Sequence, residues 1–355
     1  MANKALNDAK RAKKDEFYTR REDIERELTH YEKHFRGKTV YCNCDDPSTS
    51  EFWRFFVRNF WVYGMKKLIA THYEPDEKNF SYKMEVTEVK RGQLFYDAER
   101  VPIASNGDFR SACCVELLKE ADIVVTNPPF SLFREYVAQL MEYDKKFIII
   151  GNQNAVTYKE IFSLLQSNSL WMGYHAGAMS FRVPDTFERN NTFFEDGEKY
   201  AKFGNICWFT NLDIPKRHMS LDLRGNYYSP EKYPKYVNYD AIEVARVDDI
   251  PIDYDGEMGV PITFIARYNP EQFEIVGSSR WLGRPMSEIA PKGSYVAGGI
   301  RFYLPIDKTD ETADNLSRNG TERNGTERNG TERNGTERNG TERNGTERKI
   351  IPLSL

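Results

Sequence analysis

The stretch Ala121–Phe130, ADIVVTNPPF, decides the fold. Its apolar and mostly β-branched run, Ile123–Val125, is typical of a strand buried in a parallel sheet. The two prolines that follow cannot continue a sheet ladder, because proline has no backbone N–H. The chain must therefore leave the sheet at Asn127. That point is the carboxyl edge of the strand, where open α/β sheets bind their ligands.

The residues Asn127-Pro-Pro-Phe130 suit a flat ring that carries an exocyclic amine. The Asn127 side-chain oxygen and the Pro128 carbonyl can accept the two N–H groups, which bends the lone pair of the amine out of the ring plane. Phe130 offers an apolar face on which the ring can stack. The structural alternative is a strand that ends in a Pro-Pro turn. The apolar strand before the motif and the helical pattern at Leu132–Tyr143 favour the functional interpretation.

These four residues resemble the catalytic Asn/Asp-Pro-Pro-aromatic motif of the S-adenosylmethionine-dependent amino-methyltransferases. The motif alone does not select adenine, since protein-glutamine and some guanine-N2 methyltransferases have a similar one. We expect a direct displacement at a sulfonium methyl group, in which positioning does most of the work. A cytosine-C5 methyltransferase needs a cysteine nucleophile, and no Pro-Cys dipeptide occurs in the chain.

The composition favours a cytoplasmic, monomeric enzyme. The 355 residues, 39% of them hydrophobic, suit two domains with a sizeable core. No apolar run is long enough to span a membrane, and the polar N-terminus lacks the apolar core of a secretory signal. Five cysteines, four of them in two close pairs, favour a reducing compartment and no metal site. The net charge of −4 argues against a protein that coats DNA nonspecifically.

Polar residues at two early positions are candidates for binding the methyl donor. Asp15-Glu-Phe-Tyr-Thr19 resembles the N-terminal cofactor-pocket motif of several adenine methyltransferases, and its candidates are Phe17, Tyr18 and Thr19. The predicted strand Lys38–Tyr41 ends where a dinucleotide-binding fold has a Gly-rich turn. An aspartate there can meet the cationic amino group of the methionine moiety. The candidates are Cys42, Asn43, Asp45 and Asp46. The alternative is a capped turn before a helix near Ser50.

Two later positions complete the expected donor pocket. Glu74 follows the predicted strand Lys67–Thr71, and an acidic residue near this point accepts hydrogen bonds from ribose hydroxyls in nucleoside-binding sheets. A surface carboxylate is the alternative. After Gly107, which allows a tight turn, Asp108 can bind an adenine amino group while Phe109 stacks on the ring.

The pattern along the chain indicates three regions. Residues 1–215 alternate strands and helices, which predicts an α/β catalytic domain: a mostly parallel sheet with helices on both faces and a late antiparallel pair. Its elements include an aromatic buried helix at 50–63 and strands at 170–174, 179–183 and 205–210. Residues 216–316 mix basic and aromatic residues, which suits either DNA contact or a tyrosine-rich loop on the core. Residues 317–355 hold six tandem NGTER copies and are predicted to be a disordered tail.

Seven motifs occur in order between Asp15 and Phe264: DEFYT, VYCNCDDP, KKLIA, GDFRS, DIVVTNPPFSLFREY, YDKKF and MGVPITF. Together they resemble the EcoRI-type adenine-specific DNA methyltransferase family. The resemblance implies a Rossmann-like fold, S-adenosylmethionine as donor, and methylation of adenine N6 in double-stranded DNA within type II restriction–modification. The target adenine must then leave the base stack. Asn127, Pro128 and Phe130 become the adenine site, and the region after about residue 215 supplies target recognition.

Two other functions remain open at this point. A protein-glutamine or RNA amino-methyltransferase would share the NPPF chemistry, but it would not need a target-recognition segment as long as residues 216–316. A catalytically silent DNA- or nucleotide-binding protein would bind the donor without turnover. A labelled-methyl assay on duplex DNA, RNA and protein distinguishes the three.

Overall fold

The computed structural model describes residues 17–44, 46–74, 81–87, 98–299, 302–305 and 348–353. The chain divides into two compact units. The first is Met1–Met219 with Ile265–Tyr268, and the second is Ser220–Phe264 with Asn269–Leu355. Among the described residues, no helix has both the length and the apolar character needed to cross a bilayer.

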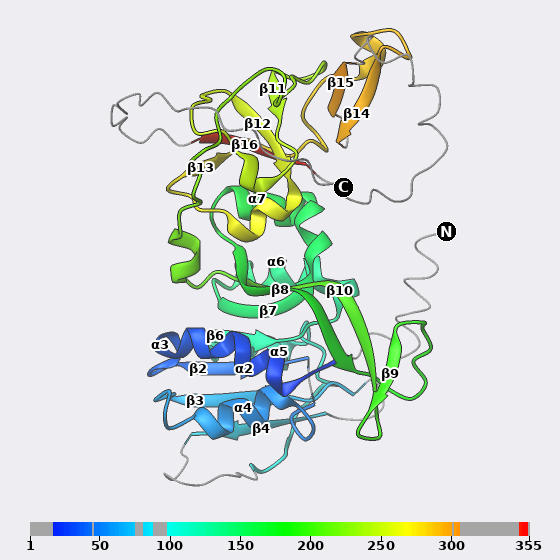
Figure 1. The fold of residues 1–355 in the computed structure, drawn as a ribbon. Helices are drawn as coiled ribbons and strands as arrows, with labels where there is room; N and C mark the ends of the chain where they lie inside the picture. Colours follow the sequence, from blue (N-terminus) through cyan, green and yellow to red (C-terminus); the bar gives the residue numbers. More distant parts are fainter. Residues whose placement is uncertain are drawn as a thin grey trace. The chain divides into compact units, whose positions relative to one another are not determined.

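The first unit is built on a large mixed sheet (Figure 1). Four parallel strands form its centre in the order β3-β2-β6-β7: Lys67–Thr71, Thr39–Cys42, Ile123–Thr126 and Lys146–Asn152. Antiparallel strands extend both sides: β10 (Glu198–Thr210), β8 (Trp171–Arg182) and β1 (Tyr18–Thr19) beyond β7, and β4 (Tyr82–Val86) and β5 (Val101–Pro102) beyond β3. A short strand, β9 (Thr192–Glu195), pairs with β10.

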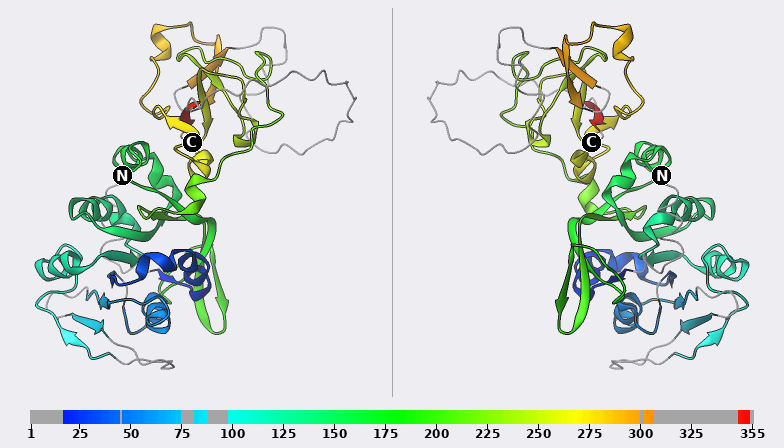
Figure 2. Two further views of the ribbon diagram at one scale, coloured as in Figure 1. Left: turned by 90° about the vertical axis from the view of Figure 1, so that its left-hand side faces the viewer. Right: turned by 90° about the vertical axis from the view of Figure 1, so that its right-hand side faces the viewer.

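Helices pack against both faces of this sheet. Figure 2 shows the blue helices on one side and the cyan-to-green helices on the other. The blue set is α2 (Arg21–Leu28), α3 (Glu32–Phe35) and α4 (Glu51–Asn59), and the other set is α5 (Ala112–Glu120), α6 (Phe133–Glu142) and α7 (Lys159–Gln166). Short 3-10 turns lie between them: η1 (Thr29–Tyr31), η2 (Phe130–Leu132) and η3 (Gln153–Thr157).

The predicted aromatic helix is confirmed as core. In α4 the side chains of Phe52, Trp53, Phe55 and Phe56 are all buried. They join the main core cluster together with alternate residues of the central strands. The Ser50 hydroxyl accepts the backbone N–H of Trp53, so it caps the helix as the sequence suggested.

The late strands are longer than predicted. Segments expected as two strands at 170–174 and 179–183 form the single strand β8, and the strand expected at 205–210 extends back to Glu198 as β10. Gly177 has a positive φ of 127° within β8, where the register to β10 shifts. A glycine inside a strand interrupts the apolar sequence pattern, so two strands were predicted. The hydrogen-bonded ladder nevertheless continues past Gly177.

The second unit has its own small sheet. Its strands run parallel in the order β11-β12-β16-β13: Ala241–Glu243, Glu257–Pro261, Arg348–Leu353 and Phe273–Ile275. A separate hairpin pairs β14 (Tyr295–Gly299) with β15 (Phe302–Pro305). The remaining turns are η4 (Pro215–His218, in the first unit), η5 (Val247–Asp249), η6 (Ile262–Arg267, whose residues from Ile265 on belong to the first unit) and η7 (Met286–Glu288).

The expectation that all of residues 317–355 lack structure is wrong for Arg348–Leu353. These residues form β16, an inner strand of the second sheet, and Ile350 and Ile351 are fully buried. Ile351 packs with Tyr236 and Phe302 in the core of the second unit. The apolar residues after the last NGTER copy were the available signal. Most of the repeat tract itself lies outside the described residues.

This arrangement predicts opposite effects for two changes near the C-terminus. Ile351→Ala should destabilise the second unit by about 2–5 kcal/mol, because it leaves a cavity in the core. Removing three of the six NGTER copies should shift the unfolding free energy by less than about 0.6 kcal/mol, since loop-closure entropy changes slowly with loop length. Urea denaturation of both variants checks this. If Ile351→Ala left the unfolding free energy unchanged, the structural role given to β16 would be contradicted.

Candidate active site

The carboxyl ends of the parallel strands form one polar edge in the first unit. Strand β6 ends at Thr126, whose hydroxyl donates to the Asn43 carbonyl just beyond β2. Tyr136 of α6 donates its hydroxyl to the Asn43 side-chain oxygen. Asn43 and Thr126 are both buried. These bonds join the ends of β2 and β6, so the residues after the two strands are held beside each other.

Asn127 is the first residue beyond β6, and its side chain is 7% exposed. Its amide nitrogen donates to the Phe17 carbonyl oxygen at 2.7 Å. Only the nitrogen of a carboxamide can donate, so this bond fixes which end of the side chain faces away from Phe17. The Asn127 Oδ1 atom is buried and accepts no hydrogen bond from the residues that the structure describes. A buried acceptor with this character needs a donor, and a bound amine would supply one.

The ring of Phe130 lies in a group of phenylalanines, which we call the aromatic cluster: Phe17, Phe130, Phe181, Phe187 and Phe203. The ring centroids of Phe17 and Phe130 are 5.5 Å apart, and those of Phe130 and Phe181 are 6.2 Å apart. Phe130 is only partly buried, whereas Pro128 is buried. Phe130 is therefore not fully enclosed by the cluster, and it lies three residues after Asn127 in the same turn.

Three residues of the N-terminal motif are expected to bind the methyl donor. Tyr18 and Thr19 form strand β1, and Phe17 directly precedes it. Tyr18 and Thr19 pair with Arg182 and Phe181 of β8, and the Arg182 guanidinium lies 4.8 Å from the centre of the Tyr18 ring. Successive side chains of a strand point to opposite faces, so Thr19 shares the face of Phe181 and of the aromatic cluster. Thr19 is 3% exposed, and its hydroxyl has no hydrogen-bond partner in the described part of the chain.

The end of β2 and the turn after it carry four of the residues predicted to bind the methyl donor. Cys42 is buried as the last residue of the strand. Asp45 lies outside the described residues. The Asp46 carboxylate accepts hydrogen bonds from the Ser48 backbone N–H and from the Tyr82 hydroxyl at 2.9 and 2.6 Å. Burial opposes ionisation of Asp46, but these bonds outweigh it and lower the pKa of the carboxyl group.

Asp46 thus fills the role of a turn cap while remaining an anion beside β3. The ring of His72, just beyond β3, stacks on Tyr82 with centroids 5.1 Å apart. The His72 Nε2 atom lies 4.0 Å from the Glu74 carboxylate. The backbone N–H of Glu74 donates to the Asn106 carbonyl at 2.7 Å, which ties this strand end to the loop that carries Asp108.

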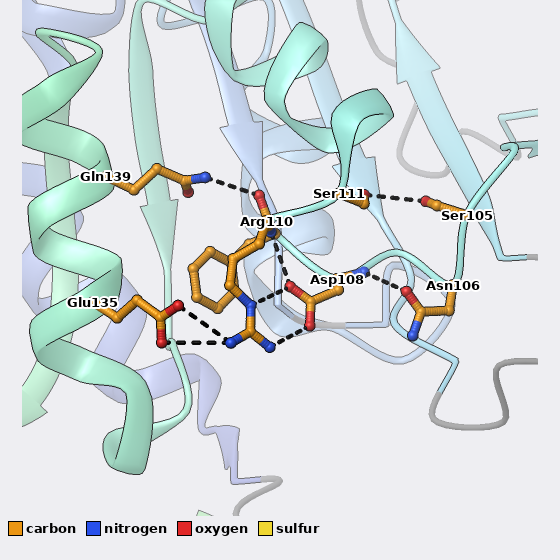
Figure 3. A network of polar contacts seen from close by, with 8 residues as sticks. Ser105, Asn106, Asp108, Arg110, Ser111, Glu135 and Gln139 are labelled. Atoms are coloured by element: carbon orange, nitrogen blue, oxygen red, sulfur yellow. Dashed lines mark hydrogen bonds and ion pairs between the residues drawn. The ribbon is translucent and has the colours of Figure 1, made fainter.

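Asp108 lies in a network of polar contacts (Figure 3). Arg110 donates to both oxygens of the Asp108 carboxylate, at 2.9 and 2.7 Å, and also contacts Glu135 of α6. Burial raises the pKa of Asp108, but the bonds from Arg110 are stronger in effect and lower it overall. The Phe109 ring is buried edge-on against Tyr136, with centroids 5.0 Å apart. One tyrosine thus supports both Asn43 and Phe109.

The structure therefore brings Asn43, Asp46, Glu74, Asp108 and Asn127 to one edge of the sheet. Sequence reasoning missed the groups that hold them. Tyr136 was missed because it lies on the apolar stripe of α6, although a tyrosine on a buried stripe needs a partner for its hydroxyl. The Phe17 carbonyl left no sequence signal, since every residue has one. No group of His, Cys, Asp and Glu residues that could hold a metal ion occurs among the described residues.

Comparisons with known proteins agree with this arrangement. Residues 5–351 match the family described as adenine-specific methyltransferase EcoRI. The type II methyltransferase M.EcoRI of Escherichia coli is 48% identical over 289 residues, which cover 77% of this chain and 89% of the relative. M.MpnI of Mycoplasma pneumoniae is 42% identical over 278 residues, covering 76% and 84%. M.MgeORF184P of Mycoplasma genitalium is 40% identical over 278 residues, covering 76% and 85%. No solved structure matches.

The chain has a strand-end carboxamide whose oxygen accepts no hydrogen bond from the described residues, and together with these relatives this places the protein among the adenine-specific methyltransferases. More particularly, the chain belongs to the EcoRI adenine-specific methyltransferase family, and the match spans nearly its whole length. The α/β architecture, the enzyme class and the family expected from the sequence are confirmed.

The tight turn before Asp108 gives a test of the site's packing. Gly107 and Gly197 have nearly the same positive φ, 82° and 81°, but a Cβ on Gly107 would lie 1.8 Å from the His72 carbonyl oxygen and one on Gly197 would meet nothing within 4 Å. Both Gly→Ala variants should lose about 1 kcal/mol from backbone strain. Gly107→Ala should lose clearly more and should also weaken binding of the methyl donor. Urea denaturation and calorimetry would show it; equal behaviour of the two variants would contradict the packing described.

Proposed function

We propose that this chain transfers a methyl group from S-adenosylmethionine to N6 of an adenine that is flipped out of duplex DNA. The observation that carries the proposal is the buried Asn127 Oδ1 atom, which no described residue satisfies. Together with the Pro128 carbonyl it offers two acceptors for the two N–H groups of one amine. Phe130 of the same motif is only partly buried, and its ring would stack on the face of the base.

The strand order supports a Rossmann-like site. Strand β2 has β3 on one side and β6 on the other, so the chain changes direction in the sheet between β2 and β6. Open α/β sheets bind their ligands in the crevice at such a point, outside the carboxyl ends of the strands. Asn43 and Asn127 lie there. The helices on both faces complete the arrangement expected of a Rossmann-like methyltransferase.

The residues of the edge fit the proposed donor. When bound, S-adenosylmethionine supplies an electrophilic methyl group on a sulfonium. The Thr19 hydroxyl, which has no partner among the described residues, and the ionised Asp46 carboxylate would hold the methionine end, since its amino group is cationic. Glu74 would accept the ribose hydroxyls. Asp108 would accept the adenine amino group, because each oxygen that Arg110 occupies keeps a second lone pair.

Catalysis then rests on positioning by the chain's own groups. Two acceptors on one amine fix its direction and raise the electron density available at nitrogen. Correct orientation of the two reactants can lower the activation free energy by a large amount, without a covalent enzyme intermediate. The buried surroundings of Asn127 exclude water from the reacting atoms and strengthen its hydrogen bond.

The DNA partner places a second demand on the chain. Extrusion of an adenine costs a few kcal/mol, which contacts elsewhere on the duplex must offset. We assign these contacts to the second unit, which offers a hollow lined by Asn238, Tyr239 and Arg284 among others. Arginine and tyrosine are suited to base edges and stacking. The enzyme would act as a monomer in the cytoplasm, as the modification enzyme of a type II restriction–modification system.

Asn127→Ala should reduce methyl transfer to duplex DNA by about 10²–10³-fold, on the scale seen when one preorganised hydrogen-bonding group of an active site is removed. Binding of S-adenosylmethionine should persist, because the lost acceptor serves the amine. The measurement is incorporation of labelled methyl groups into duplex DNA, RNA and protein.

Asn59→Ala is the matched control. The Asn59 amide nitrogen also donates to a phenylalanine carbonyl, that of Phe55, at 2.8 Å, but Asn59 is the last residue of α4. This variant should methylate DNA at the normal rate. Substantial transfer by Asn127→Ala, or transfer by the wild-type chain to RNA or protein rather than DNA, would refute the proposal.

A further inference from the structure

We infer that the backbone carbonyl of Phe17 is a positioning group for the methyl transfer: it locks the Asn127 carboxamide with its oxygen toward the acceptor amine. The inference rests on the function proposed above and adds a role for the N-terminal segment. That segment was assigned only to the methyl donor by its sequence.

The reason for a lock lies in the chemistry of the carboxamide. Its two ends are nearly equal in size, and a rotation of 180° about the last side-chain bond exchanges an acceptor for a donor. With nitrogen toward the substrate, Asn127 would meet an amine donor to donor and could not accept its hydrogen. Nothing within the side chain itself prefers one orientation. A neighbouring group must therefore set the orientation of the carboxamide. A carbonyl oxygen can do so because it only accepts hydrogen bonds and thus binds the amide nitrogen.

The Phe17 carbonyl is the group in place to do this. It accepts from Asn127 Nδ2 at 2.7 Å, and the Asn127 side chain is 7% exposed, so water cannot readily substitute. Turning the amide would bring Asn127 Oδ1 against the Phe17 oxygen. Two buried acceptors that face each other without a proton between them repel and lose their hydrogen bonds, so the turned orientation is disfavoured.

The aromatic cluster holds this carbonyl in place. The Phe17 ring packs against Phe130, Phe181, Phe187 and Phe203, with centroid separations of 5.5, 5.8, 5.8 and 5.0 Å. The next two residues are tied into the sheet through β1. The Phe17 ring therefore has two roles: it anchors the carbonyl that orients Asn127, and it packs against the ring of Phe130.

A charged side chain borders the aromatic cluster: the Arg189 guanidinium lies 5.5 Å from the centre of the Phe187 ring. The rings of the aromatic cluster are not ionisable. The nearest charged side chain on the strands beside β1, Arg182, lies over Tyr18, whose side chain points to the opposite face from Phe17. Arg182 is also engaged with Glu198 at 3.4 Å. The Asn127–Phe17 bond is thus an interaction between neutral groups.

Asn127→Asp tests the lock, because the introduced carboxyl group can reproduce the Asn127 pattern only when it is protonated. The protonated group donates its O–H to the Phe17 carbonyl and presents its C=O to the amine. The ionised group has two acceptors and faces the Phe17 oxygen with a negative charge. If the only role of residue 127 were to accept from the amine, the ionised form would be the better acceptor, and activity would rise with pH.

If the Phe17 carbonyl positions Asn127, the activity of Asn127→Asp should change with pH in the opposite direction. The ratio of kcat for Asn127→Asp to kcat for wild type should fall with rising pH, by about tenfold per unit above the pKa of the introduced group. Asn59→Asp makes the same change at the Asn59–Phe55 bond and should give a flat ratio near one. A ratio for Asn127→Asp that is flat, rises, or is zero at every pH in a folded protein would overturn the inference.

Variants of Phe17 give an independent readout. Phe17→Ala should lower kcat at least tenfold, with KM for the methyl donor nearly unchanged, and Phe17→Leu should restore part of kcat by refilling the cluster. If Phe17 acts only on the donor, KM rises and kcat stays, which would refute a positioning role. If the wild-type chain methylates no DNA, RNA or protein, the proposed function itself fails. If the wild-type chain methylates DNA normally but the variants do not behave as predicted, only the positioning role of Phe17 is refuted and the proposed function stands.

Discussion

The hydrogen bond from Asn127 to the Phe17 carbonyl is the interaction on which the proposed active site depends. It joins the residue after the central strand to the segment before the first one, which are far apart in sequence. A typical buried hydrogen bond contributes only about 1 kcal/mol to stability. The bond matters here because it fixes the direction of the carboxamide: the Asn127 oxygen is left buried, oriented and without a hydrogen bond from any described residue. The adenine amine that the family acts on has the donors that such an oxygen lacks.

The rest of the edge follows from how parallel strands end. Because β2, β3 and β6 run in the same direction, the residues that follow them emerge together. Thr126 and Tyr136 then bind Asn43 from two sides, and Arg110 fixes Asp108 against α6. Each of these bonds fixes a polar group without using all of its hydrogen-bonding capacity. The polar residues of the edge are thus held in place and remain able to bind ligand.

The central residues of the candidate site were predictable from the sequence, because local chemistry determines where the strand before them ends. Two prolines stop a strand wherever they occur, and the aromatic helix α4 has too many rings to stay outside the core. The α/β class and the order of motifs were predictable for the same reason. The phenylalanines of β8 and β10 were not linked to the site, since only the long antiparallel ladder brings Phe181 and Phe203 to Phe17. Strand β16 was missed because a short apolar segment after a polar repeat has no local sign of its distant partners.

We propose that this edge methylates adenine N6 in DNA. The most direct test is methylation-sensitive sequencing of DNA from cells that express the chain, compared with cells that do not. We expect N6-methyladenine at one defined sequence throughout the genome, and only in the expressing cells. DNA without that mark, or with methyl groups on cytosine instead, would contradict it.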